Sequence, residues 1–422
     1  MTSNYNIKSF FKELRNNSLI DNLFLFIPLL LITGPFLPDL SLVIIVLIGL
    51  FKYQKSLLKI IKNNNIIIII FLFSIYNILN SLFSDEIIIS FKSSLTYLRF
   101  PLFAVILALI LKENSKLPYQ FYLIIKILVI FLSMDAFFQF IFNFNFFGFE
   151  AIQKNRISGM FDNEYILGSY LSRLFPIYLF LNFYTNDFNF HNTKKNLFFT
   201  LIVSFAIFLS GERTSLLIIG TFLVFLYILN NQKSFRQYLK NFFSISLILA
   251  LIILIFSKDI RERYIYLTFS QVLNFNIGNL KQEDIKSQNL LHLKVSYEMF
   301  KDKPINGYGN KMFGHKCFKE YFINDGRCST HPHNFLAQIL VETGLIGLIF
   351  YFLLIFNLLK EIFNLKSILN GTVLILLISI LINFFPFFPT GNIFNNWLNI
   401  LFYLPISFYI FLKDDYSNNN YS

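Results

Sequence analysis

Hydrophobic residues occur along this chain in long blocks, and short polar stretches separate the blocks. The blocks at 66–78, 247–256 and 345–359 are nearly unbroken runs of apolar side chains without strict alternation. A helix needs about 20 mostly apolar residues to cross a hydrocarbon core of about 30 Å, and its backbone groups are satisfied internally. Blocks that are apolar on all sides predict helices rather than the alternating strands of a barrel.

These blocks predict an all-α, polytopic membrane protein of about twelve transmembrane helices. Only one connection is long, and it follows the ninth predicted helix. The prediction divides the chain into 1–257 with nine helices, 258–333 as a long outer loop, and 334–422 with three helices and a tail. Residues 19–54 fit either one hairpin or two tilted spans. The predicted spans are 19–38, 39–54, 65–83, 94–111, 120–143, 164–183, 197–211, 214–230, 242–257, 334–358, 367–385 and 394–412.

Lysine and arginine in the short connections set the predicted orientation, because cytoplasmic loops are enriched in these residues. With the N-terminus inside, the inner connections hold most of them, including the four lysines from Lys52 to Lys62. The short outer loops hold few, among them Arg156 and Arg213. Both chain ends are then predicted in the cytoplasm. The two arginines and the long loop face outside, where they could form one site.

The composition agrees with a membrane protein, because 55% of the 422 residues are hydrophobic and only 14% are charged. A soluble domain carries about 25% charged residues. The formal net charge of +12 would suit nucleic-acid binding. The basic residues lie between the predicted spans, however, where topology rules place them. We therefore expect no nucleic-acid partner, and since no acidic cluster resembles a metal site, we expect no metal or other cofactor.

Both cysteines of the chain, Cys317 and Cys328, fall in the long outer loop. An outer compartment permits disulfides, and closing so short a loop contributes about 3 kcal/mol in the chain-entropy model. We predict a disulfide between them, with two free thiols as the alternative. Metal binding by the cysteines and nearby histidines is disfavoured, because the spacing matches no standard zinc pattern.

The loop is also predicted to contain an amphipathic helix over 287–302, lying on the membrane or packed on the bundle. Its apolar stripe would consist of Leu290, Leu293, Tyr297 and Phe300. Pro304 ends this helix, and a turn containing Gly307 and Gly309 follows. The glycines either form a simple turn, which we favour, or let backbone N–H groups approach a phosphate.

Polar residues gather where the loop enters the tenth predicted helix, in the run His331, Pro332, His333 and Asn334. Polar groups at this depth are costly unless they have a partner or a task. A lone histidine would more often be a satisfied structural residue. Two histidines and an asparagine together at a membrane boundary favour a functional site.

This stretch resembles the O-antigen ligase and polymerase superfamily, and the ligases most closely. The ligase pattern is His, Asn or a similar polar residue, nine residues, and Gly-x-x-Gly; here His333 and Asn334 precede Gly344 and Gly347 at that spacing. Further similar stretches are the Arg-x-x-Gly-x-Phe segment at 156–161, the Ser-x-x-Arg turn at 210–213, and the turn at 304–309. A departure is that family members often carry an arginine in the amphipathic helix, where this chain has His292 and Lys294.

The resemblance implies transfer of a glycan from undecaprenyl diphosphate on the outer, periplasmic face of a bacterial cytoplasmic membrane. The acceptor would be a sugar hydroxyl, on lipid A–core for a ligase or on another glycan for a polymerase. Negative charge builds on the departing diphosphate, and fixed guanidinium groups can stabilise it. A histidine can accept the proton of the attacking hydroxyl, and such direct attack would invert the anomeric centre.

We assign these roles residue by residue. His333 is the expected base, and Arg156 and Arg213 are expected to stabilise the leaving group, with anchoring on lipid headgroups as the alternative for each arginine. Expected substrate-binding residues are His331, Asn334, Gly307, Gly309, Arg99, His292 and Glu342. Asp135 and Arg173 should lie at similar depth within their spans and form a structural pair.

Other functions fit part of the pattern. A polymerase of O-antigen or capsule would use the same chemistry with a glycan acceptor, and an enzyme glycosylating protein hydroxyls is related. A transporter of the lipid-linked glycan belongs to a different class. Against transport, the polar residues cluster outside the membrane rather than at its midplane, and no inverted repeat is evident.

Overall fold

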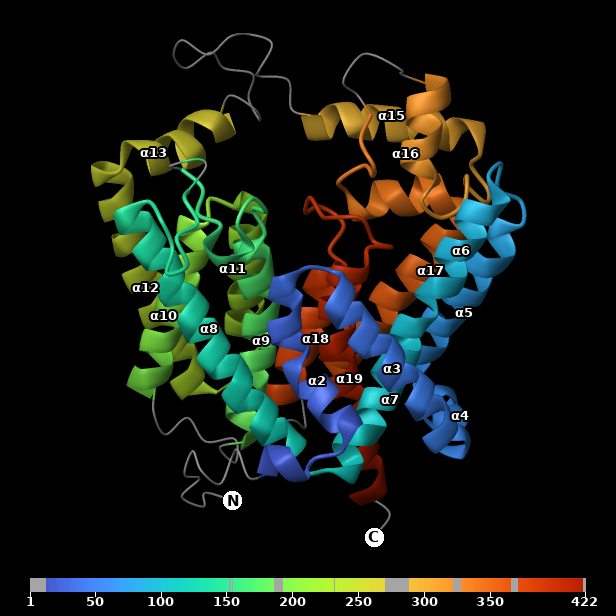
Figure 1. The fold of residues 1–422 in the computed structure, drawn as a ribbon, viewed down its shortest axis with the longest axis horizontal. Coiled ribbons are helices and arrows are strands. Elements are labelled where there is room, and N and C mark those ends of the chain that lie inside the picture. The colour runs from blue at the N-terminus through green and yellow to red at the C-terminus, as the bar shows by residue number, and fades with distance from the viewer. Residues whose placement is uncertain are drawn as a thin grey trace. The chain divides into compact units, whose positions relative to one another are not determined.

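The protein is all-helical throughout the residues that its computed structural model describes, which are 13–151, 153, 155–185, 193–230, 232–269, 288–321, 328–365 and 371–419 (Figure 1). The first half contains α2 (Leu19–Leu30), η1 (Leu31–Thr33), α3 (Phe36–Lys52), α4 (Gln54–Lys62), α5 (Asn65–Ser81), α6 (Ile87–Tyr97), α7 (Arg99–Glu113), α8 (Leu117–Phe142), η2 (Gly159–Phe161), α9 (Leu167–Thr185) and α10 (Thr193–Leu209). The second half contains α11 (Arg213–Leu229), α12 (Lys233–Phe256), α13 (Lys258–Arg261), η3 (Glu262–Tyr266), α15 (Gln288–Asp302), α16 (Met312–Lys316), η5 (Cys317–Tyr321), α17 (Phe335–Leu365), α18 (Gly371–Asn383) and α19 (Asn396–Asn419).

Several of these helices are long and apolar enough to cross a membrane. The helices that meet both criteria are Ile87–Glu113, Leu117–Phe142, Lys233–Phe256 and Phe335–Asn364, and a fifth candidate is the pair α3 and α4, bent by 99°. Shorter apolar helices occur at Leu19–Thr33, Asn65–Ser81, Lys195–Leu209, Arg213–Leu229 and Gly371–Asn383. Every predicted span coincides with a helix, so the all-helical class is confirmed, while the number twelve stays a prediction.

Two stretches differ from the sequence-based expectation. The residues before the fourth predicted span form α6, and α6 with α7 makes one apolar stretch over Ile87–Glu113. The basic residues from Lys233 to Lys240 were predicted in a cytoplasmic connection, but they form the first turns of α12. Once a helix has formed, each added residue gains a backbone hydrogen bond whatever its polarity, so α12 extends beyond the apolar block that predicted the span.

The contacts of the chain group it into two units rather than into consecutive segments. Unit 1 consists of Met1–Ser41, Ile110–Asn279 and Leu365–Asn383, and unit 2 consists of Leu42–Leu109, Leu280–Asn364 and Phe384–Ser422. Each unit is therefore assembled from three separate stretches of chain. This grouping follows packing, whereas the predicted division at 257 and 333 follows the order of spans and loops and stays a prediction.

The core of unit 1 is built around α9, which packs against α8, α10, α11 and α18. Nearly all side chains of α9 and of α18 are buried. The loop between α8 and α9 is tied to α8, where Gln139 Oε1 accepts a hydrogen bond of 2.7 Å from the Gly159 N–H. The turn between α10 and α11 and the segment α13–η3 lie at the same end of this unit (Figure 1).

In unit 2 the long helix α17 is interrupted at Gly344, whose φ of 63° and ψ of −162° are not helical. The turn at 304–309 pairs with the interruption. The Tyr308 and Gly309 N–H groups donate to the Val341 and Glu342 carbonyls at 2.9 Å. In return, the Leu345 N–H donates to the Pro304 carbonyl at 2.9 Å. The backbone groups that the kink would leave unsatisfied are thus bonded to the turn.

Glycines make this close approach of two backbones possible. A Cβ on Gly344 would lie 2.3 Å from the Ile305 carbonyl oxygen, and a Cβ on Gly307 would lie 2.6 Å from the Val341 carbonyl oxygen. A Cβ on Gly347 would meet the Thr343 hydroxyl at 1.8 Å. The Gly-x-x-Gly pair of the motif and the glycine of the turn therefore have a packing reason. For Gly307 the simple turn is the interpretation that this geometry favours.

Helix α15 forms within the predicted range, but the face that it buries is different. Val295 and Met299 pack in a core with Met312, Phe313 and Val341. The predicted stripe is largely exposed, with Leu290 at 53% and Tyr297 at 61%. Both faces of this helix carry apolar residues, so periodicity alone did not determine which face packs inward. The exposed face suits the expected position at a membrane surface.

Candidate functional site

Three arginines of unit 1 converge on the turn between α10 and α11, and we call them the arginine cluster (Arg156, Arg213 and Arg263). Arg156 packs against Gly211, where an added Cβ would lie 3.0 Å from the Arg156 Cγ. Arg263 Nε donates to the Gly211 carbonyl at 2.9 Å, and Arg213, two residues further along, donates to the Thr268 hydroxyl at 3.1 Å. Gly211 has a φ of 67°, so its left-handed conformation and lack of a Cβ both permit this arrangement.

The arginine cluster is half-buried and positive. Burial lowers the pKa of Arg156, and the charge of Arg263 lowers it further. Burial is also the main cause that lowers the pKa of Arg263. The Arg156 guanidinium lies 3.9 Å from the Tyr165 ring centre, and its buried Nε has no hydrogen-bond partner among the residues described. Since arginine stays charged in proteins, the cluster is suited to bind an anion.

Glu212 lies within the same turn and fixes it to α9. Its carboxylate accepts hydrogen bonds from the Gly168 N–H at 2.6 Å and the Ser169 N–H at 3.1 Å. These are the first N–H groups of α9, which an acceptor at a helix N-terminus satisfies. Burial raises the pKa of Glu212 to about 7, and these hydrogen bonds together with Arg156 oppose the increase. The carboxylate therefore aligns the turn and offsets only part of the positive charge.

Arg263 and Glu212 were missed by the sequence analysis. Arg263 follows α12 in a loop whose basic residues carry no topological information, because long loops translocate regardless of charge. Its neighbour Tyr264 gives a usable signal, since the Tyr264 ring stacks on Phe208 at 4.7 Å and its hydroxyl donates to the Phe208 carbonyl at 2.7 Å. In the sequence, the pair Arg263 and Tyr264 shortly after the predicted span ending at 257 is the signal that could have indicated a third guanidinium.

Three histidines of unit 2 stack in a row, and we call them the histidine cluster (His292, His331 and His333). The ring centres of His331 and His333 lie 4.0 Å apart, and those of His292 and His333 lie 5.3 Å apart. His292 comes from the buried face of α15 and is only 4% exposed. Segments separated in the sequence thus bring together His333, the expected base, and His292 and His331, two of the expected substrate-binding residues.

The surroundings keep His331 and His333 neutral near pH 7. Burial, with a smaller effect from the charge of His333, lowers the pKa of His331 to about 4. Burial and the charge of His292 lower the pKa of His333. The buried Nε2 of His331 makes no hydrogen bond of normal geometry with a described residue. A neutral imidazole with a free ring nitrogen can accept a proton.

The backbone at His333 is in the left-handed region, with a φ of 54°. Non-glycine residues rarely adopt it, and such strained positions often occur at functional sites. The His333 carbonyl accepts a hydrogen bond of 3.0 Å from the Thr390 N–H. Asn334 and Pro389 form an isolated antiparallel β-bridge. The loop before α19 therefore holds this conformation in place.

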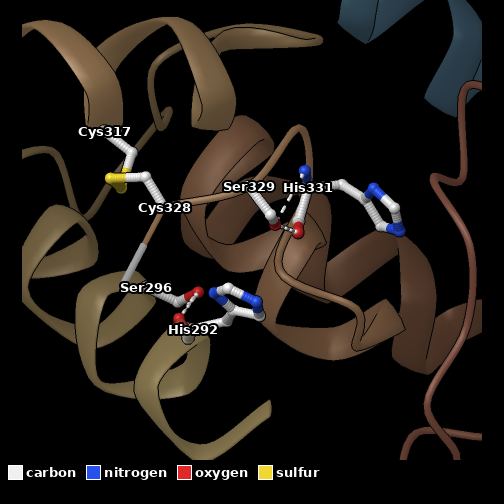
Figure 2. The surroundings of a disulfide bond; sticks show 6 residues. All are labelled: His292, Ser296, Cys317, Cys328, Ser329 and His331. Carbon is white, nitrogen blue, oxygen red and sulfur yellow. Dashed lines mark hydrogen bonds between the residues drawn. A yellow bond between two sulfur atoms is a disulfide. The ribbon is translucent and has the colours of Figure 1, made fainter. Parts of the chain in front are cut away.

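The expected disulfide between Cys317 and Cys328 is present, and it holds the histidine segment. Figure 2 shows that Cys328 leads directly to Ser329 and His331, while His292 projects from the neighbouring helix. The Thr330 hydroxyl lies 3.0 Å from His331 Nδ1, and Ser329 bonds to the His331 backbone. One covalent link therefore fixes the chain three residues before His331.

A comparison with protein families identifies part of the chain. The sequence profile of the O-antigen ligase family matches residues 198–352. Residues 198–352 are an O-antigen ligase domain. The matched range contains Arg213, Arg263, the whole histidine cluster and the kink of α17. A search of the curated proteins finds no match.

The match covers less than half of the chain. Several helices of the described residues, inside and outside the matched range, are long and apolar enough to cross a membrane. Arg156 lies outside the matched range but contacts the Ser210–Arg213 turn inside it. No group of three or more histidine, cysteine or acidic residues that could hold a metal occurs in the described part of the chain.

Other predicted binding residues of the ligase domain are bonded to the protein itself. Asn334 caps α17, since its Oδ1 accepts from the Ala337 N–H at 2.9 Å while its Nδ2 donates to the Pro386 carbonyl at 2.9 Å. Glu342 is fully buried, and its carboxylate accepts from the Phe313 N–H at 3.2 Å and from Gln338 at 3.1 Å. These contacts assign positioning tasks to Asn334 and Glu342.

Two further expectations concern residues outside the ligase domain. Arg99 begins α7, stacks over the Phe100 ring at 4.5 Å and donates to the Thr96 carbonyl. The predicted pair of Asp135 and Arg173 does not form. Asp135 instead accepts a hydrogen bond of 2.9 Å from the Phe146 N–H, and Arg173 donates to the Ser169 carbonyl at 3.0 Å. Backbone groups at the ends of their own helices offer nearer partners than the opposite charge.

Proposed function

We propose that the protein is an O-antigen ligase that transfers a glycan from undecaprenyl diphosphate to a sugar hydroxyl of lipid A–core on the periplasmic face of the cytoplasmic membrane. The observation that carries this proposal is the convergence of three arginines on the turn at 210–213. Three half-buried guanidinium groups beside one carboxylate leave a net positive charge, which a multiply charged anion would complement. A diphosphate is such an anion, and its charge increases as it leaves.

An apolar cavity supports a lipid-linked donor. It has a volume of about 420 Å³ and lies among α10, α11 and α12, where Phe205, Phe208, Leu223 and Phe242 are among its lining residues. The carbonyl of Phe208 accepts the Tyr264 hydroxyl beside the arginine cluster. A diphosphate bound by the arginines would therefore have an apolar surface for its polyprenyl chain within the same unit.

The histidine cluster supplies the base for the same reaction. The acceptor oxygen attacks C1 of the donor sugar, the bond from C1 to the diphosphate oxygen breaks, and the hydroxyl proton passes to a neutral imidazole, which we assign to His333. The products are the glycosylated acceptor and undecaprenyl diphosphate, and the anomeric centre is inverted. A second proton on the stacked neighbours is disfavoured, so the cluster takes up one proton per transfer.

The proposal is tested by reconstitution with undecaprenyl-diphosphate glycan and lipid A–core, in EDTA and without ATP. The lipid products are followed on a gel. We expect a shift of lipid A–core to glycan-bearing forms. His333→Ala should reduce the rate by about 10²- to 10⁴-fold, and Arg213→Ala by about 10²- to 10³-fold. Arg236→Gln, an exposed arginine on α12, is the matched control and should keep full activity.

The outcomes separate the competing functions. Lengthening of the lipid-linked glycan without transfer to lipid A–core would make the protein a polymerase and reject the ligase assignment. A protein that forms neither product but moves the lipid-linked glycan across vesicles, and tolerates His333→Ala, would be a transporter. Full activity in Arg213→Ala would remove the basis of the proposed diphosphate site.

A further inference from the structure

A second cavity lies in unit 2, between α16, η5 and the segment before α17, and the chemistry described above does not use it. Its volume is about 480 Å³, within the range of about 300–1,000 Å³ that small-molecule sites occupy. Lys311, His315 and Lys319 line it from three positions of α16 and its flanks. Phe318 adds an aromatic ring.

The lining of this cavity is basic without an acidic residue among the described positions. Two carboxylates, those of Asp85 and Glu86, lie nearby, but Asp85 is already paired with lysines outside the cavity lining. Asp85 pairs with Lys303 and Lys316, both at 2.6 Å. Among the lining residues that the structure describes, Lys319 forms an ion pair, with Glu86 at 2.8 Å. The remaining basic side chains give a concave surface that attracts an anion.

The polar walls of the cavity connect it to the histidine cluster within the same unit. Thr330 lines the cavity, and its hydroxyl lies 3.0 Å from His331 Nδ1. Asn392 also lines it, and its Oδ1 accepts a hydrogen bond of 2.9 Å from Gln338, which in turn donates to Glu342. A ligand in the cavity would therefore touch Thr330, whose hydroxyl contacts His331, the histidine that stacks beside the proposed base.

The backbone of the cavity wall is fixed at Lys311 and at Gly314. Lys311 has a left-handed φ of 63°, and its N–H together with that of Phe313 bonds to the buried Glu342 carboxylate. Gly314 brings the backbone of α16 against Thr330, where an added Cβ would lie 3.1 Å from the Thr330 Cα. The cavity wall is thus anchored to α17 and to the histidine segment rather than being a loose surface.

We propose that this cavity binds an acidic saccharide, and that it selects a glycosyl acceptor carrying a phosphate or a carboxylate close to the hydroxyl that reacts. The proposal rests on the proposed transfer function and adds the acceptor class. The lysines bind the anionic group, Phe318 stacks on the apolar face of a sugar ring, and Thr330 and Asn392 contact hydroxyls. Neutral glycans would lack the main interaction.

Binding is measured directly, so that the test does not depend on turnover. The probe is the phosphorylated core oligosaccharide released from lipopolysaccharide, compared with the same oligosaccharide after phosphatase treatment. The full-length protein in detergent should bind the phosphorylated form about tenfold more tightly, and raised ionic strength should weaken this binding. Lys311→Gln should remove most of the difference. Lys301→Gln, an exposed lysine of α15 paired with Glu298, is the control and should retain it.

Each result decides for or against the cavity. Charge-dependent binding that is lost in Lys311→Gln, in a protein that catalyses no transfer, would support the cavity and reject the transfer function. Transfer with equal binding of both oligosaccharides would support the function and overturn the acceptor proposal. Displacement of the oligosaccharide by nanodiscs of phosphatidylglycerol, but not of phosphatidylcholine, would make the cavity a lipid-headgroup site and also overturn it.

Discussion

The arginine cluster and the histidine cluster are held in place by different means. The arginine cluster depends on hydrogen bonds from Arg263 and Arg213 to a carbonyl and a hydroxyl, and on the stacking of Arg156 over a ring. The histidine cluster is surrounded by a disulfide, a helix cap and a strained backbone position at His333. The first arrangement rests on non-covalent contacts alone, whereas the second includes a covalent link close to the histidines.

The difference follows from the chemistry of the side chains. A guanidinium keeps its charge under all conditions that a protein meets, so its site needs only to gather it and exclude water. An imidazole acts as a base only while its pKa remains in a working range, and that pKa depends on burial and on neighbouring charges. A rigid surrounding is therefore more valuable to the histidines than to the arginines.

The largest effect on stability is expected from a substitution at the kink of α17, the helix that follows the histidine segment. Gly344→Ala would place a Cβ 2.3 Å from the Ile305 carbonyl oxygen at a φ of 63°. We expect a loss of more than about 3 kcal/mol in the free energy of unfolding, and little folded protein. Gly220→Ala is the control, because its Cβ meets no atom within 4 Å in α11 and should be neutral or slightly stabilising. Equal melting temperatures for the two variants in detergent would contradict the account of the kink.

The next effect tests whether the arginine cluster needs its third member. Arg263→Gln removes the charge, and we expect kcat/KM for transfer to fall by about 100-fold, with Arg263→Lys recovering part of it. The oligosaccharide binding proposed for unit 2 should not change. Steady-state kinetics with varied donor measures the effect against Arg236→Gln, and full activity in Arg263→Gln would leave Arg156 and Arg213 as the only functional guanidinium groups.

A smaller effect is expected from the covalent link. The double variant Cys317→Ser with Cys328→Ser should lose about 3 kcal/mol of stability and about tenfold in kcat, because the segment before His331 gains freedom. Binding of the lipid-linked donor should stay the same. Reductant should reproduce the result in the unaltered protein and change nothing in the variant. If kcat survives reduction unchanged, the disulfide has no part in positioning the histidines.

The smallest effect concerns pH. A base must be neutral to act, and burial lowers the pKa of His333, so the acidic limb of the kcat/KM profile should fall below pH 6.5. His331, whose pKa is lowered to about 4, adds stability that is present above its unfolded value of about 6.5 and is lost as the pH falls through about 4. A profile from pH 4 to 8 checks the first statement and thermal unfolding checks the second. An acidic limb above pH 6.5 would mean that the base is exposed to water.

The sequence allowed the helices and the main candidates to be predicted, because both depend on local information. Block length in lipid identifies a helix whatever its partners, and the spacing from His333 to Gly347 lies within one segment. The structure adds a physical reason for that spacing. The asparagine caps α17 where it begins, and the first glycine of the pair marks its interruption.

What could not be predicted depends on contacts between distant parts of the chain. The buried face of α15 was misjudged because apolar residues occupy both of its faces, and only packing against Val341 selects one. Arg263 was missed because it falls in the long predicted loop, outside every stretch that resembles a family motif. The pair of Asp135 and Arg173 was inferred from equal depth, but depth does not exclude nearer backbone partners. Periodicity and spacing carry no information of this kind.

The insertion of the turn at 304–309 into the kink of α17 has an evolutionary consequence. Backbone hydrogen bonds clamp the chain at Gly309 and at Val341, so the stretch between them is a closed loop with fixed ends. The entropy of closing a loop increases only slowly with its length. This stretch carries Lys311, His315 and Lys319 of the basic cavity and also His331, His333 and the first turns of α17, so these residues, rather than closure entropy, limit how far its length can change. A change in the proposed acceptor cavity would therefore be felt by the histidine cluster, because one closed loop carries both.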